Sequence, residues 1–228
     1  MRVAVPDRKG DMGASRSSRS APSERVRLTR ERVLEAALVV IDRDGLERLS
    51  MRRLGSELGV EAMSLYNHVA DKDDVLDGVV GLLWCEVDRR ASSGGDWAQQ
   101  ARSFAAAVRR TAHEHPHAYP LVLIRGVLPD RLMAMGSRLV GSLREAGFGE
   151  LAPQAMLALA SHATSQALAE VSWYGARAAT GTSAAVADWP PTVVVEQELP
   201  RYEAEAPLAF GLELLIEALE ARLAARRA

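Results

Sequence analysis

Residues 50–72, SMRRLGSELGVEAMSLYNHVADK, contain two short helical patterns that meet at a glycine. Leu54 and Leu58 lie four residues apart in the first pattern, and Gly59 supplies the turn. The second pattern has an inner apolar side and an outer side of small, polar and aromatic residues: Val60, Leu65 and Val69 inside; Met63, Ser64, Tyr66, Asn67 and His68 outside. This arrangement is typical of a helix-turn-helix that presents its second helix to a DNA groove.

A helix that braces this unit is expected just before it. Thr29 is a suitable N-cap residue, and Gly45 marks the end of the helix. One face of this segment is apolar: Val33, Ala36, Ala37, Val40 and Ile41. Ser50 is the expected N-cap of the second helix. Three short helices that hold one another rigidly would let the exposed side of residues 62–68 enter a groove about 12 Å wide.

The stretch from Thr29 to Leu83 resembles the DNA-binding domain of tetracycline-repressor (TetR) family transcriptional regulators. The landmarks of the resemblance are Ala36-Ala37, Gly45, Leu54, Leu58-Gly59-Val60, Leu65-Tyr66, His68-Val69 and Lys72. The resemblance implies an all-α fold: an N-terminal three-helix helix-turn-helix domain and a larger C-terminal helical ligand-binding and dimerisation domain. We expect a disordered basic arm at 1–27, the DNA-binding domain at 28–72 and the second domain at 73–228.

The resemblance also assigns DNA contacts, at Arg52, Ala62, Met63, Ser64, Tyr66, His68 and Lys72. Arg52 suits a guanine edge, whereas hydroxyl, imidazole and ammonium groups suit phosphate oxygens. In the founding repressor the position matched by Ala62 carries an amide that reads a base, and alanine makes that hydrogen bond impossible. The operator sequence therefore does not transfer. Taken singly, each of these residues also fits a solvated helix face.

Composition agrees with this interpretation. The chain has 228 residues, 48% of them hydrophobic, with one cysteine, so an intrachain disulfide is excluded. The first 27 residues are too polar for a secretory signal, and no apolar run is long enough to span a bilayer, so we expect a cytoplasmic protein without membrane association. The net charge of −2 conceals a basic N-terminal end. That end is either a floppy extension, with Met12 an alternative start, or an arginine-bearing arm that follows DNA.

Two clusters raise the question of a metal. Asp71, Asp73 and Asp74 stand where an N-cap with acidic residues in the first turn of a helix over about 71–90 is expected, and this interpretation is favoured over an enzyme-like metal site. His113, His115 and His117 surround Pro116, which ends the preceding helix. A solvated helix terminus accounts for these histidines, with ligand or metal contact as the alternative. We therefore predict no metal and no cofactor.

Beyond residue 90 the pattern predicts helices at about 96–114, 117–125, 129–146, 152–178 and 207–226, with a long loop at 179–206. The last helix has a leucine stripe: Leu208, Leu212, Leu215, Leu219 and Leu223. The stripe fits either the interior of the chain or a partner helix. The resemblance implies a homodimer formed through helices 152–178 and 207–226, and one short recognition helix covers only half of a two-fold site.

The candidate ligand residues are Trp84, Asp88, Phe104, His162, Gln166, Glu170, Trp173 and Tyr174, with Trp189 as a further aromatic. His162, Gln166, Glu170 and Tyr174 stand four apart and form one polar line, which fits an exposed face, a dimer seam or a cavity wall. The aromatic residues fit a cavity or the core equally well. Asp88 stands where the founding repressor places a drug-binding histidine, which argues against tetracycline as the effector.

Three functions remain open from the sequence. The leading one is a homodimeric repressor that binds a palindromic double-stranded DNA operator and is released by a small-molecule effector. The second is an activator, or a regulator of the same fold controlled by a protein partner. The third is an all-helical metal-dependent enzyme that uses Asp71–Asp74 or the histidines, although no nucleophile with its base is evident.

Overall fold

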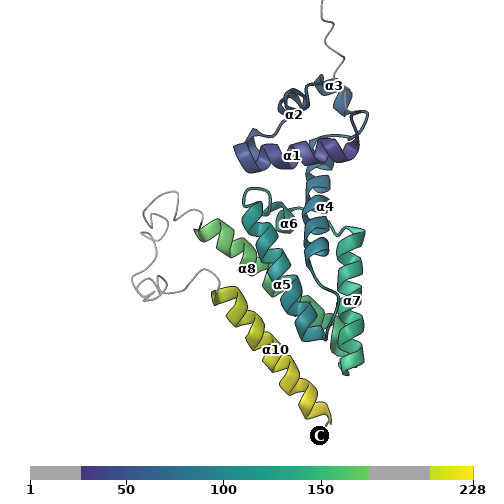
Figure 1. Ribbon diagram of the computed structural model, residues 1–228, viewed down its shortest axis with the longest axis vertical. Helices are drawn as coiled ribbons and strands as arrows, with labels where there is room; N and C mark the ends of the chain where they lie inside the picture. The colour runs from purple at the N-terminus through teal and green to yellow at the C-terminus, as the bar shows by residue number, and fades with distance from the viewer. Residues whose placement is uncertain (1–26, 175–205, 228) are drawn as a thin grey trace, which may run out of the picture.

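The computed structural model describes residues 27–174 and 206–227, and every regular element in these ranges is helical. The N-terminal unit contains α1 (Arg30–Asp44), a 3-10 turn (Leu46–Arg48), α2 (Met51–Leu58) and α3 (Ala62–Leu65). Figure 1 shows this unit at one end of an elongated molecule, with a helical bundle below it. The predicted all-α fold is confirmed.

The predicted helix ends of α1 and α2 are confirmed at the level of individual hydrogen bonds. The Thr29 hydroxyl accepts from the Arg32 amide at 3.3 Å, and the Ser50 hydroxyl accepts from the Arg53 amide at 3.2 Å. Gly59 ends α2 in the left-handed conformation, with φ of 66°. Together, these caps fix the short segments that the helix-turn-helix needs.

The recognition helix is shorter than its pattern predicts. α3 ends at Leu65, and Tyr66 to His68 follow as a turn. The amides of His68 and Val69 both donate to the Leu65 carbonyl, so the turn stays wound against the end of the helix. Leu65 and Val69 are buried as expected, whereas Val60 is only partly buried.

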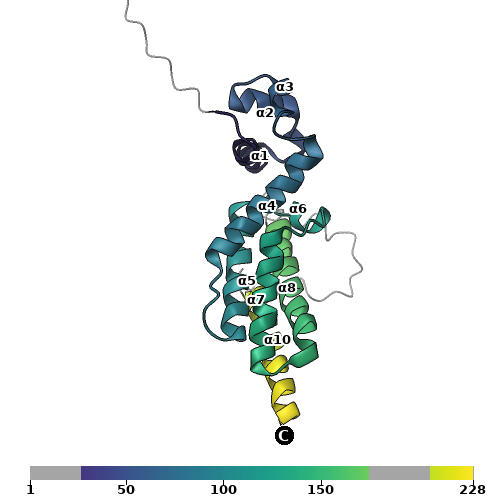
Figure 2. The same cartoon turned by 90° about the vertical axis from the view of Figure 1, so that its right-hand side faces the viewer.

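The helix α4 (Lys72–Arg90) joins the two parts of the molecule. Its buried residues Val75, Val79 and Leu83 belong to one apolar cluster that also contains α1 residues and residues of α5, α6 and α7. Figure 2 shows α4 running from the helix-turn-helix unit into the bundle. The 72/73 domain boundary remains a prediction, because α4 packs on both parts.

The bundle consists of α5 (Trp97–Glu114), α6 (Leu121–Ile124), α7 (Asp130–Ala146), a 3-10 turn (Gly149–Leu151), α8 (Ala152–Ala169), a π-helical turn (Glu170–Tyr174) and α10 (Ala206–Arg227). The predicted 117–125 helix shrinks to four residues, since its first part is a turn that ends at Pro120. The expected arm (apart from Arg27) and the 179–206 loop (apart from Ala206) lie outside the described residues.

The leucine stripe of α10 packs inside the chain. Leu212 and Ile216 are buried in a second apolar cluster with Phe148 and Leu159, and Leu215, Leu219 and Leu223 pack against it. The side chain of Leu208 lies outside the described residues. Of the two alternatives for the stripe, the described residues favour the intrachain core. No described helix is both long enough and apolar enough to cross a membrane.

Gly55 has a role that sequence reasoning missed. A Cβ built on it would lie 2.9 Å from the Val60 carbonyl oxygen and 3.1 Å from the Ala62 amide nitrogen. These are backbone atoms, which cannot move aside as a flexible side chain can. The close crossing of α2 and α3 therefore requires a residue without a side chain at this position.

Gly55→Ala should lower the free energy of unfolding by about 1–3 kcal/mol, because the backbone clash outweighs the better helix propensity of alanine. The matched control is Gly81→Ala in α4, where an added Cβ meets nothing within 4 Å. That variant should be more stable by about 0.4–1 kcal/mol. Urea unfolding measures both. Equal effects of the two substitutions would contradict the crossing constraint.

Candidate functional site

The outward side of the helix-turn-helix unit carries the residues predicted to contact DNA. Met63 and Tyr66 are 73% and 46% exposed, which is unusual for large side chains. Arg52 and Lys72 are exposed as well, whereas Ala62, Ser64 and His68 are half-buried. These residues come from α2, α3, the turn after it and the first residue of α4, so the fold brings the predicted set to one end of the molecule.

Unlike Arg52, the nearby arginines Arg43 and Arg53 form ion pairs with acidic residues of the chain. Arg53 donates to Asp44 at 2.9 Å, and Arg43 binds both Asp44 and Glu57. Within the described part of the chain, no hydrogen bond or ion pair is found for the Arg52 or Lys72 side chains. These two cations therefore remain available to a ligand outside the chain.

The turn that carries Tyr66 and His68 is held from behind. Arg30 of α1 donates to the His68 carbonyl at 3.2 Å and forms a bidentate pair with Asp74 at 2.8 and 2.6 Å. Asp71 caps α4 by accepting from the Asp74 amide at 2.8 Å, as predicted. The Arg30 guanidinium and the Ala70 amide lower the pKa of Asp74 to about 2. Asp71 thus caps α4, and Asp74 joins α4 to α1 through Arg30.

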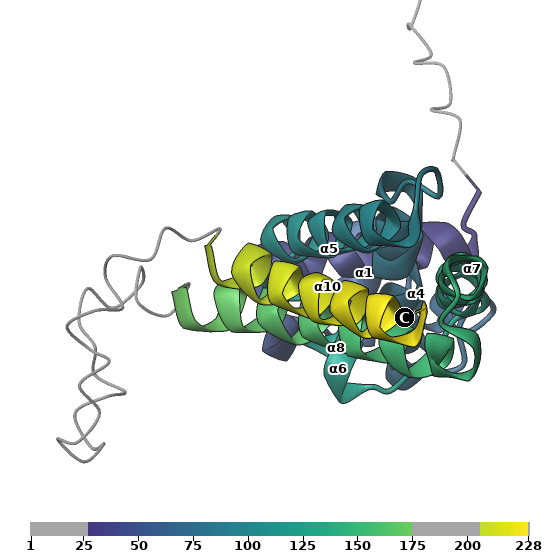
Figure 3. The ribbon, with the colours of Figure 1, turned by 90° about the horizontal axis from the view of Figure 1, so that it is seen from below.

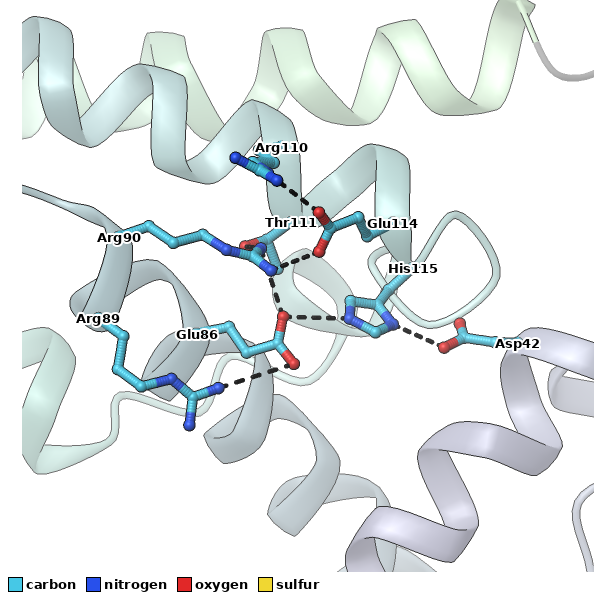
Figure 4. Close-up of polar contacts among 8 residues, drawn as sticks. All are labelled: Asp42, Glu86, Arg89, Arg90, Arg110, Thr111, Glu114 and His115. Atoms are coloured by element: carbon cyan, nitrogen blue, oxygen red, sulfur yellow. Dashed lines mark hydrogen bonds and ion pairs between the residues drawn. The ribbon is translucent and has the colours of Figure 1, made fainter.

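The three histidines lie at the end of α5, where His113 and His117 are exposed, as expected for a solvated terminus, whereas His115 is half-buried. His113 Nε2 lies 2.9 Å from buried Glu170, and His117 Nδ1 lies 3.0 Å from the Asp42 carbonyl oxygen. His115 is only 16% exposed and lies between Asp42 and Glu86 (Figure 4). The packing of α1 and α4 over the end of α5 causes this burial, and a local pattern cannot reveal it.

Glu86, Glu114 and His115 lie close enough together to suggest a metal site. Arg90 occupies the space between the two carboxylates: it pairs with Glu114, approaches Glu86 at 3.4 Å and donates to the Thr111 hydroxyl at 2.7 Å (Figure 4). A guanidinium already neutralises these acids. The cluster is therefore an ion-pair network between α4 and α5.

A cavity of about 430 Å³ lies in the bundle, within the usual range for small-molecule sites. Its lining is mainly apolar and comes largely from α7, with contributions from α5, α8 and the loop after α4. The lining includes Phe104, Leu132, Met133, Arg138 and Met156. Phe104 is the only predicted ligand residue among them.

Two other predicted ligand residues support the cavity from behind. Trp84 stacks on Phe104 with ring centroids 6.4 Å apart. Asp88 of α4 accepts from Arg138, a cavity residue, at 2.6 Å and from Arg131 at 3.2 Å. Asp88 is thus an ion-pair partner of the cavity wall, so the cavity is linked directly to α4.

The described members of the polar line, His162, Gln166 and Glu170, are not among the residues that line this cavity, so the cavity wall is not supported for them among the three alternatives. Glu170 is 1% exposed and pairs with Arg109 at 2.8 Å and with His113 at 2.9 Å, both on α5. His162 packs against Gly211 of α10, and Gln166 is half-buried. The side chains of Trp173, Tyr174 and Trp189 lie outside the described residues. Spacing put His162, Gln166 and Glu170 on one face, and α5 contacts that face at Glu170 while α10 contacts it at His162.

Comparison with known proteins places these features in context. The description "Bacterial regulatory proteins, tetR family" matches residues 33–79. A Saccharopolyspora erythraea HTH-type transcriptional regulator is 38% identical over 122 residues, 54% of this chain and 52% of the relative, so the match spans about half of that relative. The repressor DrrR1 of Streptomyces coeruleorubidus is 28% identical over 88% of this chain and 80% of its own.

Solved structures agree over most of the chain. Apo ActR from Streptomyces coelicolor superposes with a TM-score of 0.69 at 29% identity, covering 87% of this chain and 98% of its own. ActR has also been solved with actinorhodin bound. The two sequence relatives are named as a transcriptional regulator and a transcriptional repressor, which favours a regulator over the enzyme hypothesis. Helix-turn-helix geometry and family match agree that residues 33–79 carry the DNA-binding domain of the tetR family of bacterial regulatory proteins, and the chain as a whole is similar in fold to regulators of that family.

Proposed function

We propose that the chain is a homodimeric repressor that binds a palindromic operator and is released by a small molecule. The observation that carries the proposal is the exposed set Arg52, Met63, Tyr66 and Lys72 on a braced helix-turn-helix. The relative DrrR1 is named as a repressor, and so are tetracycline repressors that are 28% identical over 87% of this chain. These names support repression over activation.

The residues of the DNA-facing set fall into two groups, those suited to phosphate contacts and those suited to base contacts. Lys72, Tyr66, Ser64 and His68 supply donors for phosphate oxygens, which fix the register on the duplex. Arg52 is the residue able to form a bidentate contact with guanine, and Met63 offers apolar contact to a thymine methyl. Ala62 carries no hydrogen-bonding group, so DNA shape must contribute to the choice of sequence.

The dimer face that we propose lies on α8 and α10. These helices run side by side along the lower part of the molecule (Figure 3). Phe210 and Leu214 are 67% and 49% exposed and lie one turn apart on α10, opposite its buried residues. A pair of such faces related by two-fold symmetry would cover these side chains and supply the second recognition helix.

The effector that we propose is an apolar molecule with an acidic group. The described cavity lining is mostly apolar, and its polar members are serine, glutamine and arginine side chains without a carboxylate. Arg138 is the cation that also holds Asp88 of α4. An acidic ligand group would compete with Asp88 for Arg138 and so loosen α7 from α4. ActR binds actinorhodin, which supports a small-molecule effector for this chain.

Lys72→Ala should weaken DNA binding and reduce the slope of log K against log salt concentration by about two units, one phosphate contact per subunit of the dimer. Titration of a duplex recovered by binding selection, at several salt concentrations, measures the slope. Arg222→Ala serves as the control, because it removes one positive charge at an exposed position of α10. An unchanged slope for Lys72→Ala, or equal changes in both variants, would remove the phosphate assignment.

Phe210→Glu combined with Leu214→Glu should convert the dimer to a monomer, because four carboxylates would have to be buried in the shared face. Light scattering on a size-exclusion column gives the molar mass. Ile124→Glu on α6 changes an even more exposed residue, 75% accessible, away from the proposed face. A double variant that keeps the mass of the wild-type protein would place the interface elsewhere.

Arg138→Met should weaken binding of the anionic probe 1-anilinonaphthalene-8-sulfonate about tenfold, since a charge-assisted hydrogen bond is lost. Affinity for the neutral probe N-phenyl-1-naphthylamine should stay the same. Arg131→Met is the control, because Arg131 binds Asp88 but does not line the cavity. Fluorescence titration reports both probes. A parallel loss for the neutral probe would point to a collapsed cavity instead of a charge-selective one.

A further inference from the structure

His115 lies where the helix-turn-helix unit meets the bundle. Its Nδ1 is 2.6 Å from Asp42 Oδ2, in the last turn of α1, and its Nε2 is 3.1 Å from Glu86 Oε2 on α4. His115 is the residue directly after α5 and forms its C-cap. Figure 4 shows the imidazole between the two carboxylates. One side chain therefore connects three helices that belong to different parts of the molecule.

The geometry specifies a protonation state. A neutral imidazole has one N–H donor and one acceptor nitrogen, whereas the imidazolium has two donors. Both ring nitrogens face carboxylate oxygens, so only the imidazolium can donate to both. A neutral ring would turn a lone pair toward one of the acids. With both carboxylates ionised, the bridge is therefore complete only when His115 is protonated.

The surrounding charges make the two carboxylates unequal. Glu86 also receives Arg90 at 3.4 Å and Arg89 at 4.0 Å, and the next acid, Glu114, is paired with Arg90 and Arg110. Asp42 has no such neighbour: its carbonyl meets His117, and its Oδ1 is buried without a hydrogen-bond partner among the described residues. Compensation of the Asp42 carboxylate therefore depends on His115.

A second attachment, through Arg125 to the start of α4, responds differently to pH. Arg125, just after α6, binds Asp77 at 2.6 Å and Asp73 at 2.7 Å near the start of α4. An arginine keeps its charge throughout the physiological range. Histidine is the side chain whose ordinary pKa lies within that range. Of these two attachments, the one through His115 is the one that can lose its charge as the pH rises.

We infer that His115 is a positioning residue whose protonated ring fastens α1, and with it the recognition helix, to the bundle, and whose deprotonation releases that attachment. The DNA part of this inference rests on the proposed function. The release would free the helix-turn-helix unit to move relative to its partner in a dimer. Operator affinity would then fall, because binding must first restore the spacing of two recognition helices.

The sign of the pH dependence follows from the bridge. The hydrogen bond to Asp42 raises the pKa of His115 above 6.5; burial opposes this shift, and the charges of Asp42 and Glu86 support it. A raised folded-state pKa gives stabilisation that is complete below the unfolded value of about 6.5 and is lost as pH rises through the folded value. The attachment should therefore be firm at pH 6 and weak at pH 8.5.

Thermal unfolding of the full chain tests the attachment without DNA. His115→Gln should melt about 2–4 °C below wild type at pH 6, and the gap should close by pH 8.5. Asp42→Asn should behave in the same way from the carboxylate side. His117→Gln is the matched control: His117 sits on the same turn but meets a neutral carbonyl, so this variant should keep the wild-type pH dependence. A constant gap for His115→Gln would overturn the inference.

Histidine-ring NMR of the wild-type protein provides a test that needs no stable variant. The His115 resonance, assigned by its absence in His115→Gln or, if that variant does not fold, by its proximity to Asp42, should titrate with a midpoint above 6.5. A midpoint at or below 6.5 would overturn the bridge. This measurement separates a charged bridge from a merely buried ring.

Operator titration at pH 6 and 8.5 tests the positioning role. When the pH is raised from 6 to 8.5, the operator affinity of the wild-type protein should fall by a factor about fivefold larger than that of His115→Gln. Dividing one factor by the other cancels the general effect of pH on DNA contacts. Equal losses would overturn the positioning role even if the thermal gap behaves as expected. Failure of wild type to bind any selected duplex at either pH would instead count against the proposed function, and the thermal and NMR results would still decide on the bridge.

Discussion

The structure depends on burial of α4 along most of its length. Its apolar side chains, from Val75 through Val79 and Leu83 to Val87, pack first on α1 and then on the bundle, within one continuous apolar cluster. Neither part can move without disturbing this helix. The polar contacts at its margins, Arg30–Asp74, Arg125–Asp77 and Asp88–Arg138, occur at successive heights along it. Under the proposed function, a helix held this way would convert a change in the bundle into a displacement of the recognition helix.

The polar contacts on α4 differ in what can break them. Asp88 is held by arginines from the cavity wall, so a ligand acid can compete for them. Glu86 and Asp42 are held by a histidine, so a proton can leave. Arg125 with Asp73 and Asp77 is a permanent ion pair whose worth is limited by solvent exposure. An effector would thus break the contact of α4 with Arg138 by competition, and a rise in pH would break its contact with His115 by deprotonation.

Local features of the sequence were predictable. Caps at Thr29, Ser50 and Asp71, and the turn at Gly59, follow from interactions within a few residues, and the structure confirms them. Gly55, the His115 bridge and the burial of Glu170 were not predictable, because each depends on contacts between segments distant in sequence or on a close backbone crossing. Apart from Phe104, the cavity lining was missed for the same reason: α7 supplies most of the wall, and its exposed Met133 and half-buried Leu132 have the pattern of ordinary helix residues.

The proposed repressor function requires that the exposed face of residues 52–72 selects particular DNA as a two-fold pair. Capture of fragmented DNA from the source genome on the purified full-length protein, followed by sequencing, tests it most directly. We expect enrichment of a palindromic site whose half-sites are about one or more helical turns apart, and loss of that enrichment with Tyr66→Ala. Enrichment of no site, or of a site without two-fold symmetry, would contradict it.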